Sequence, residues 1–234
     1  MQPVQTRHKF SKRFPGMRYV LALSVLLFAS AAEGWSAFYT SVPFSATVID
    51  ADSGQPVDGA NIFAHWTLHR AQFFDSSTPV AELELFETSS RNDGSFDVEG
   101  FTKLNLTPYE LRHEDPALVI YKPGYYPAFF SSQYSSEEFA ALGPRRVSKL
   151  SGKMLRLKLW DGDYPRLNTE LSRIMQELGD DTIHSCSWTR VATFIRTVVR
   201  EQMRLKEANP AQMFASLLVN QLATSCAIQP AALR

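Results

Sequence analysis

Residues 45–62 contain a turn signal between two β-prone stretches, and this pattern constrains the fold more than any other part of the chain. Asp52-Ser53-Gly54 predicts a tight turn, because an Asp side chain can bond to backbone groups two residues on and Gly accepts a positive φ. Pro56 has no amide proton for a sheet ladder, so it belongs at a strand start or edge. The stretch therefore predicts a strand, a tight turn and a second strand.

The β pattern continues from about Phe44 to Trp160. Lys153–Trp160 alternates three leucines with Met, Arg and Lys, which predicts a strand with one buried face and one wet face. Asn92-Asp93-Gly94 predicts a tight hairpin that pairs the preceding strand with Ser95–Val98. The middle of the chain is therefore expected to fold as two stacked antiparallel layers.

Three segments together resemble the carboxypeptidase regulatory-like domain, a transthyretin-like β-sandwich: residues 45–62, Asn92-Asp93-Gly94-Ser95-Phe96 and Lys122-Pro123-Gly124-Tyr125. The resemblance covers residues 44–130 and extends at most to residue 160. It implies a mainly β sandwich (transthyretin or prealbumin-like). With the C-terminal α-helical extension that the apolar period predicts after this region, the chain is expected to be α+β overall. The resemblance also implies a scaffold without chemistry of its own. In carboxypeptidases of this kind, catalysis resides in a separate zinc-binding domain, and its His-x-x-Glu ligand pair is absent here.

Two enzyme families share transthyretin-like sandwiches. Intradiol dioxygenases hold iron with two Tyr and two His, and this chain has those residue types without the matching order: Tyr121, Tyr125, Tyr126, His65 and His69. Hydroxyisourate hydrolases end in Tyr-Arg-Gly-Ser, whereas this chain ends in Ala-Ala-Leu-Arg. The resemblance therefore favours a sandwich over residues 35–162 that binds rather than catalyses.

Residues 163–234 show apolar positions with a helical period and are predicted to be a helical region. The first helix is expected to end at Gly179, the second to be capped by Ser187, and the third to begin at Asn209-Pro210. The second and third helices are expected to form a hairpin.

The cysteines are Cys186 and Cys226, just before the second predicted helix and at the end of the third. In an antiparallel helical hairpin both would lie at the same end, so a disulfide is expected. The alternative is two unpaired buried thiols, as in a protein that is not exported.

Residues 1–34 read as a signal peptide, because five basic side chains and an apolar run, Tyr19–Ala32, precede small residues. The run has 14 residues, whereas a membrane span needs about 20. Cleavage is expected before Ala32 or before Trp35, and translation can start at Met1 or Met17. The protein is therefore expected to be exported, with the periplasm as its location. The alternative is an inner-membrane protein anchored by an uncleaved signal, which would confine membrane contact to this segment.

Charge excludes a nucleic-acid partner. The formal net charge of the 234-residue chain is zero, and without residues 1–34 it has 19 basic and 23 acidic side chains. A mildly acidic protein has no electrostatic reason to bind a polyanion such as DNA or RNA.

Candidate metal and catalytic groups are few. His65 and His69 are four residues apart in a predicted strand, roughly 13 Å at about 3.3 Å per residue, too far for one ion, so a partly wet strand face is expected there. Asp50, Asp52 and Asp58 could supply calcium ligands, but turn chemistry explains them. His113, Glu114 and Asp115 would serve an enzyme, and a solvated loop is the simpler reading. No cofactor is expected.

Candidate recognition residues lie in two places. Tyr126 and Phe129 belong to an aromatic segment and are expected to be exposed, where such rings can anchor a partner. Arg196, Arg200 and Arg204 decorate the second predicted helix and could meet acidic envelope polymers or a protein. The excursions at residues 102–116 and 128–150 are long enough to be functional or partly helical.

The sequence thus predicts a non-catalytic, exported binding or scaffold protein of the cell envelope that acts by surface recognition. Its expected partner is an envelope protein or polysaccharide. Two alternatives stay open: an envelope enzyme, metal-dependent or carbohydrate-active, that uses the sandwich loops, and an accessory subunit of a larger envelope complex.

Overall fold

The computed structural model describes residues 37–70, 79–111, 116–131, 137, 148–184, 186–208 and 226 of the 234-residue chain. The chain divides into two compact units, residues 1–36 and residues 37–234, and the described residues all belong to the second.

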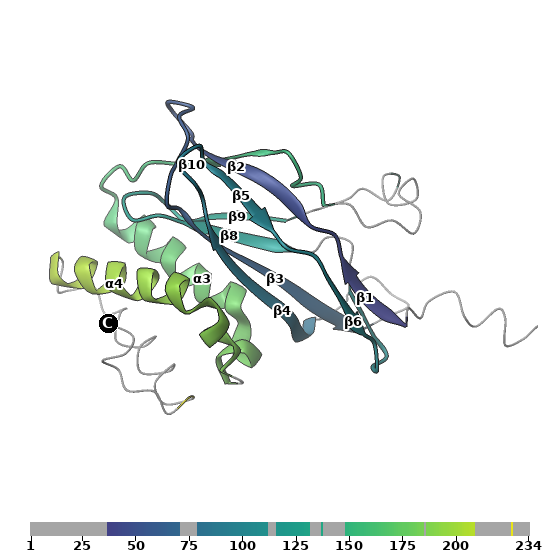
Figure 1. Ribbon diagram of the computed structural model, residues 1–234. Helices are drawn as coiled ribbons and strands as arrows, with labels where there is room; N and C mark the ends of the chain where they lie inside the picture. The colour runs from purple at the N-terminus through teal and green to yellow at the C-terminus, as the bar shows by residue number, and fades with distance from the viewer. Residues whose placement is uncertain are drawn as a thin grey trace, which may run out of the picture. The chain divides into compact units, whose positions relative to one another are not determined.

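The described part consists of ten strands followed by helices (Figure 1). The strands are β1 Phe38–Ser41, β2 Phe44–Asp50, β3 Asn61–Arg70, β4 Pro79–Ser89, β5 Ser95–Val98, β6 Phe101–Leu104, β7 Tyr109–Leu111, β8 Ala117–Tyr121, β9 Ala128–Phe130 and β10 Met154–Leu157. The helices are α3 Tyr164–His184, the 3₁₀ helix η1 Ser187–Val191 and α4 Ala192–Ala208. The predicted α+β organisation, strands first and helices last, is confirmed. None of the helices in the described residues is both long and apolar enough to cross a bilayer.

The strands form two principal sheets and a small ribbon. One sheet has the order β10-β2-β5 and the other the order β4-β3-β8-β9, with β7 also paired to β3. The ribbon is the antiparallel pair β1-β6. The expectation of purely antiparallel layers is wrong in one place, because β10 runs parallel to β2, with Leu155 opposite Val48. Parallel pairing requires a long crossover, and here more than one hundred residues separate the two strands.

The predicted turn at residues 50–54 is confirmed in its details. The Asp50 carboxylate accepts hydrogen bonds from the backbone amides of Asp52, at 3.1 Å, and Ser53, at 2.7 Å. Gly54 has a φ of 70°. The chain then leaves one sheet and enters the other, since β2 pairs with β5 and β10 whereas β3 pairs with β4, β7 and β8. The turn therefore begins a connection between layers.

The predicted hairpin at Asn92-Asp93-Gly94 is wrong, because β4 and β5 belong to different sheets. The turn itself forms, with the Gly94 amide donating to the Arg91 carbonyl at 2.7 Å. Gly94 has a φ of 75°, and a Cβ added there would lie 2.4 Å from the Val48 carbonyl oxygen. Backbone from β2 therefore passes so close to this turn that only glycine fits.

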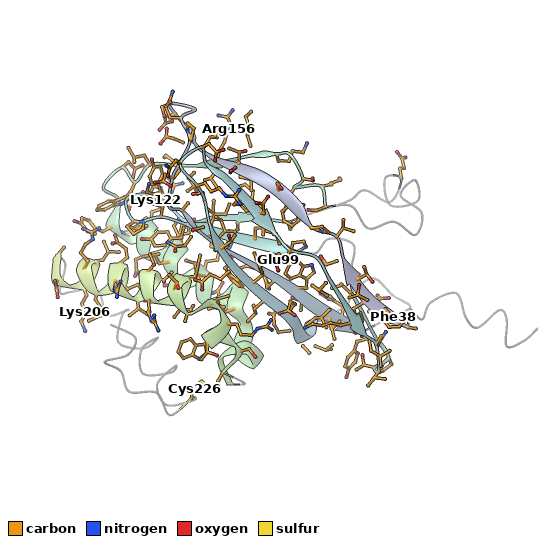
Figure 2. All side chains as sticks on the ribbon, in the orientation of Figure 1. Phe38, Glu99, Lys122, Arg156, Lys206 and Cys226 are labelled. Carbon is orange, nitrogen blue, oxygen red and sulfur yellow. A yellow bond between two sulfur atoms is a disulfide. The ribbon has the colours of Figure 1, made fainter. Side chains whose placement is uncertain are left out.

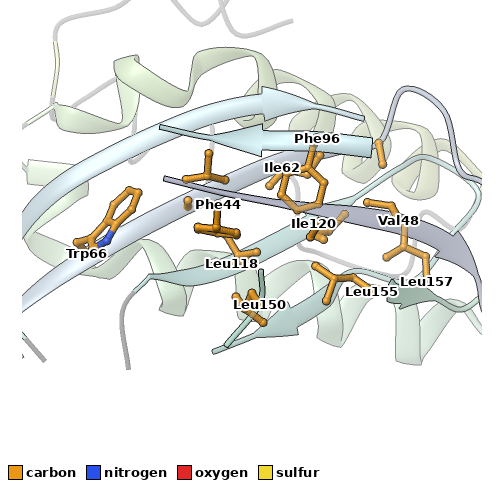
Figure 3. Close-up of a cluster of buried hydrophobic side chains, with 14 of the residues drawn as sticks. Phe44, Val48, Ile62, Trp66, Phe96, Leu118, Ile120, Leu150, Leu155 and Leu157 are labelled. Atoms are coloured by element: carbon orange, nitrogen blue, oxygen red, sulfur yellow. The ribbon is translucent and has the colours of Figure 1, made fainter. Parts of the chain in front are cut away.

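A hydrophobic core fills the space between the two principal sheets (Figure 3). Strand β3 sends alternate side chains into it, because successive residues of a strand point to opposite faces: Ile62, Ala64, Trp66 and Leu68. The facing sheet contributes Val48, Phe96, Leu155 and Leu157, all fully or almost fully buried. The alternation predicted for Lys153–Trp160 is confirmed at Leu155 and Leu157 and is wrong at Leu159, which lies past the end of β10 and is 51% exposed.

A second core lies on the other face of the β4-β3-β8 sheet. Phe63, Leu85 and Val119 pack there against apolar residues of the helices, including Leu171, Ile174, Phe194 and Val198. Strand β3 is therefore buried on both faces, and the layers follow the order sheet, sheet, helices.

The helical region differs from the prediction in two details. Helix α3 continues past Gly179 to His184, because an interior glycine weakens a helix without ending it. Ser187 opens η1 rather than capping α4, and Cys186 precedes it in a left-handed conformation with a φ of 61°. The third predicted helix, from Asn209-Pro210 onward, lies outside the described residues, of which only Cys226 belongs to that region.

The two excursions contain strands where they are described. Residues 102–116 hold the rest of β6 and all of β7, and residues 128–150 begin with β9. Most of the second excursion lies outside the described residues, as do His113, Glu114 and Asp115.

Candidate recognition surface

Helix α4 presents its arginines to solvent along one side. Arg196, Arg200 and Arg204 are exposed, and Val198 and Val199 between them are buried in the core shared with the sheet. A spacing of four residues at 1.5 Å per residue places successive side chains about 6 Å apart along the helix axis. We call these three residues the arginine row. Figure 2 shows the side chains along α4, with Lys206 near the end of the helix.

The N-terminus of α4 is held by a strand. The Glu87 carboxylate of β4 accepts hydrogen bonds from the backbone amides of Thr193, at 3.3 Å, and Phe194. The first amides of a helix have no partner within the helix and carry a partial positive charge, so a carboxylate satisfies both needs. Glu87 therefore takes the capping role that the sequence assigned to Ser187.

Replacing Glu87 with Ala is expected to destabilise the fold by about 1 to 2 kcal/mol, because two helix amides lose their acceptor and the helix dipole loses its counter-charge. Urea unfolding followed by circular dichroism measures this loss. Glu99→Ala is the matched control, since Glu99 is an exposed glutamate of the same charge. Equal stability of the two variants would contradict the capping role.

An ion pair ties η1 to the sheet, and a disulfide joins the residue before η1 to Cys226. Glu84 of β4 forms ion pairs with Arg190 of η1 and with Lys103 of β6. The predicted disulfide is confirmed: Cys186 and Cys226 are bonded, with Cα atoms 5.6 Å apart. Trp188 of η1 is buried, and its indole N–H donates a hydrogen bond to Cys226 Sγ at 3.1 Å. The helix that bears the arginine row is therefore positioned from both its sheet side and its N-terminal end.

Arg204 has a structural partner in the helix itself. Its guanidinium forms two hydrogen bonds with the carboxylate of Glu201, which is 5% exposed, and this pairing raises the pKa of Arg204. A buried carboxylate needs such a partner, because an unpaired buried charge is strongly destabilising. Arg204 also lies over the Trp160 ring, 5.8 Å from its centroid. Arg204 therefore joins the arginine row to a group of aromatic side chains.

That group lies where β10 passes into α3. The Trp160 and Tyr164 rings meet edge to face with centroids 4.9 Å apart, and the Arg166 guanidinium lies 4.6 Å from the centroid of Tyr126. Lys158 lies on the same Tyr126 ring at 5.8 Å. Alternating aromatic rings and cations attract one another through the ring quadrupole. We call this group, together with Arg204, the aromatic–basic cluster.

The expected exposure of Tyr126 is wrong, since its side chain is 4% exposed. Its hydroxyl donates a hydrogen bond to Asp161, and burial together with this carboxylate raises the pKa of Tyr126 to about 12. The same hydrogen bond, helped by Lys158, lowers the pKa of Asp161 to about 2. Tyr126 is covered because the β10–α3 connection passes over it, an arrangement that local sequence does not reveal. The buried Tyr126 ring thus packs beneath Lys158 and Arg166 of the aromatic–basic cluster.

Phe129 lies in β9 and is partly buried against the helical core. The Arg173 guanidinium of α3 lies 4.1 Å from its ring centroid and is also within 3.5 Å of Glu177. One face of Phe129 is thus already occupied by a cation of this chain. The aromatic segment with Tyr126 and Phe129 therefore packs against arginines of α3, while Arg204 lies on the neighbouring helix α4.

Sequence reasoning missed four members of the cluster: Lys158, Trp160, Tyr164 and Arg166. Their signal was the spacing of two aromatic residues four apart around Asp161-Gly162-Asp163, where a strand gives way to a helix. Asp163 caps the start of α3, because its carboxylate accepts a hydrogen bond from the Arg166 amide at 3.0 Å. This helix start sets the positions of Tyr164 and Arg166.

Two of the candidate metal ligands, Asp50 and His65, lie beside other groups of the chain. Hydrogen bonds from Ser53 lower the pKa of Asp50, whose carboxylate serves the turn. The expectation of a partly wet face at His65 is wrong, because α3 covers it and the side chain is 7% exposed, within 4.0 Å of Glu177 and 3.6 Å of Glu82. Within the described ranges, no three His, Cys, Asp or Glu side chains gather in a way that could hold a metal ion.

Comparison with known proteins gives structural similarity only. No family model matches the chain, and no curated protein matches it. Among solved structures, catechol 1,2-dioxygenase from Pseudomonas arvilla C-1 is similar over 64% of this chain and 71% of its own, with 12% identity and a TM-score of 0.31. A 9R-lipoxygenase from Cyanothece PCC8801 is similar over 88% of this chain, with 9% identity and a TM-score of 0.25. This chain covers only 32% of that lipoxygenase.

Proposed function

We propose that this chain is a non-catalytic, exported binding or scaffold protein of the cell envelope that recognises an acidic partner through its arginine row. The observation that carries the proposal is the exposed row Arg196, Arg200 and Arg204 on a helix whose first amides are bound by Glu87 of the sheet. Its proposed partner is an acidic envelope polysaccharide or an acidic face of an envelope protein. The proposal includes the periplasm as the location.

The scaffold is proposed to be a carboxypeptidase regulatory-like, transthyretin-like sandwich. Two observations support this proposal. Two sheets share one core, and residues 50–54 form a turn within the segment 45–62 on which the resemblance rests. The helical layer is an addition to such a sandwich, and it is the addition that carries the arginine row. Recognition would then reside in the part of the chain that the resemblance does not cover.

The chemistry of the row favours carboxylates and phosphates. A guanidinium stays charged at any physiological pH and presents a planar set of donors that matches two oxygens at once. A row with regular spacing of about 6 Å can meet successive acidic groups of an extended polymer. The disulfide supports an oxidising compartment, where such polymers and their protein partners occur.

Reversing two charges of the row tests the proposal. Arg196→Glu combined with Arg200→Glu is expected to weaken binding to immobilised polygalacturonate, a carboxylated polysaccharide, and to isolated envelopes by about tenfold or more, because two cationic contacts become repulsive. Arg204 is left in place because it pairs with buried Glu201. Binding of the unaltered protein is also expected to fall with added salt.

The matched control reverses two charges elsewhere. Lys153→Glu with Arg156→Glu makes the same change in net charge on the β10 side of the molecule, where both residues are exposed (Figure 2 labels Arg156). If the control weakens binding as much as the row variant does, the interaction follows net charge and the row has no special role. If neither variant changes retention on polygalacturonate or on envelopes, the proposal is wrong.

A further inference from the structure

The β1–β6 ribbon presents an uncharged outer face to solvent. Phe38 pairs with Leu104 and Thr40 with Thr102, and all four side chains are exposed. Val42 directly follows β1 and Leu106 lies two residues after β6, at the opposite end of the ribbon; both are exposed, Leu106 by 82%. Large apolar side chains scattered singly are normal on a protein surface, whereas neighbouring ones on one face mark an interaction site. We call these six residues the apolar ribbon.

The inner face of the same ribbon is firmly held. The Tyr39 hydroxyl donates to the Tyr109 carbonyl at 2.8 Å and shares a second hydrogen bond with Thr107. The Phe101 ring packs edge to face on Trp66, with centroids 5.1 Å apart. Lys103 turns inward, donating to the Leu83 carbonyl at 2.9 Å and pairing with Glu84. The outer face is thus presented by a fixed backbone, which lowers the entropy cost of docking.

The composition of the outer face suits the interfacial region of a lipid bilayer. It contains four apolar side chains and two threonine hydroxyls, so no charge has to enter a medium of low dielectric constant. Both strands of the ribbon are at an edge, and hydrocarbon cannot satisfy their outer backbone groups. The ribbon therefore fits the headgroup level, with its apolar side chains pointing toward the acyl chains.

The preceding sequence selects lipid among the possible occupants. The apolar run Tyr19–Ala32, with its basic flank, ends only six positions before Phe38. Six positions of extended chain span about 20 Å at most, so a ribbon attached to a run held in the bilayer stays close to the headgroups. Trp35 lies in this connection, and tryptophan is enriched at membrane interfaces.

We propose that the apolar ribbon rests on a lipid surface in the form of the chain that retains residues 1–34. The retained apolar run brings the ribbon to the membrane, and Phe38, Val42, Leu104 and Leu106 bury their side chains among the lipids. This adds a membrane-facing surface to the protein that is separate from the arginine row. The proposal does not depend on what the row binds.

A fluorescent probe tests the proposal on the full chain. Thr40→Cys labelled with an environment-sensitive fluorophore is incorporated into phosphatidylcholine vesicles, with the Cys186–Cys226 disulfide intact. We expect its emission to shift to shorter wavelength and to be quenched by nitroxide-labelled lipid. A probe at Lys153→Cys, exposed on the β10 side, is the control and should show neither effect. Leu104→Glu with Leu106→Glu should abolish the quenching at position 40 while the chain still floats with the vesicles.

Three outcomes would overturn the proposal: no quenching at position 40, equal quenching at positions 40 and 153, or quenching that survives the two glutamates. A shift of the position-40 probe with protein concentration and without vesicles would instead identify a second copy of the chain as the occupant. Folding of each variant is checked by circular dichroism. Binding to polygalacturonate is measured in parallel, so that failure of this proposal and failure of the arginine row are distinguished.

Discussion

Removing the Cys186–Cys226 disulfide should lower the free energy of unfolding by about 4 kcal/mol. The bond closes a loop with a sequence separation of 40, and restricting such a loop in the unfolded chain gives this value at 25 °C. The loss is measured by urea unfolding of Cys186→Ser combined with Cys226→Ser. The double variant avoids the unpaired thiol that either single variant would leave.

Wild-type protein kept in reductant is the control for this experiment. It should unfold close to the urea concentration of the double serine variant, because both lack the bond. Any higher midpoint of the reduced wild type would measure the contact of Trp188 with the Cys226 sulfur, which only the variant lacks. A difference below about 1 kcal/mol between oxidised and reduced wild type would show that the bond does not restrict the unfolded chain as proposed.

Phe63→Ala should cost about 3 to 5 kcal/mol, the range for removing a large aromatic side chain from a core. Phe63 is fully buried on the helical face of β3, and its ring meets Phe194 of α4 edge to face at 5.5 Å. Neighbouring side chains can fill little of the cavity that the substitution leaves, because Phe63 is packed between residues of the sheet and of the helices.

A double-mutant cycle with Phe194→Ala isolates the contact between the two rings. We expect a coupling free energy of about 0.5 to 1.5 kcal/mol in urea unfolding. Phe38→Ala is the control: the same substitution at a side chain that is 52% exposed should change stability by less than about 0.5 kcal/mol. Comparable losses at Phe63 and Phe38 would mean that the helices do not pack on the sheet as described.

Local features of the fold were predictable from the sequence. The turn after Asp50 depends on four consecutive residues, and the alternation in Lys153–Trp160 follows directly from strand geometry. The disulfide was predictable for a different reason: the chain has two cysteines, and the helical pattern placed them at one end of a hairpin. Each of these predictions used information contained within a short stretch or a single pair.

Long-range pairing was not predictable in the same way. The turn at Asn92-Asp93-Gly94 is compatible with β5 pairing to β4 and with β5 pairing to β2. The packing of the two sheets determines that β5 pairs with β2. The parallel pairing of β10 with β2 joins residues about a hundred positions apart. Tyr126 was expected at the surface because the residues that cover it, Asp161 and Arg166, are distant from it in sequence. The aromatic–basic cluster was missed for the same reason.

Strand β4 has eleven residues and, among the described strands, pairs with β3 alone. A long strand with one free edge can recruit a strand from another molecule and start aggregation. Here Glu84 sits on that strand with Arg190 and Lys103 bound to it, while Glu87 is engaged by the start of α4. An incoming strand would have to separate these ion pairs and displace the helix. The contacts that attach the helical layer thus also protect the sheet from unwanted polymerisation.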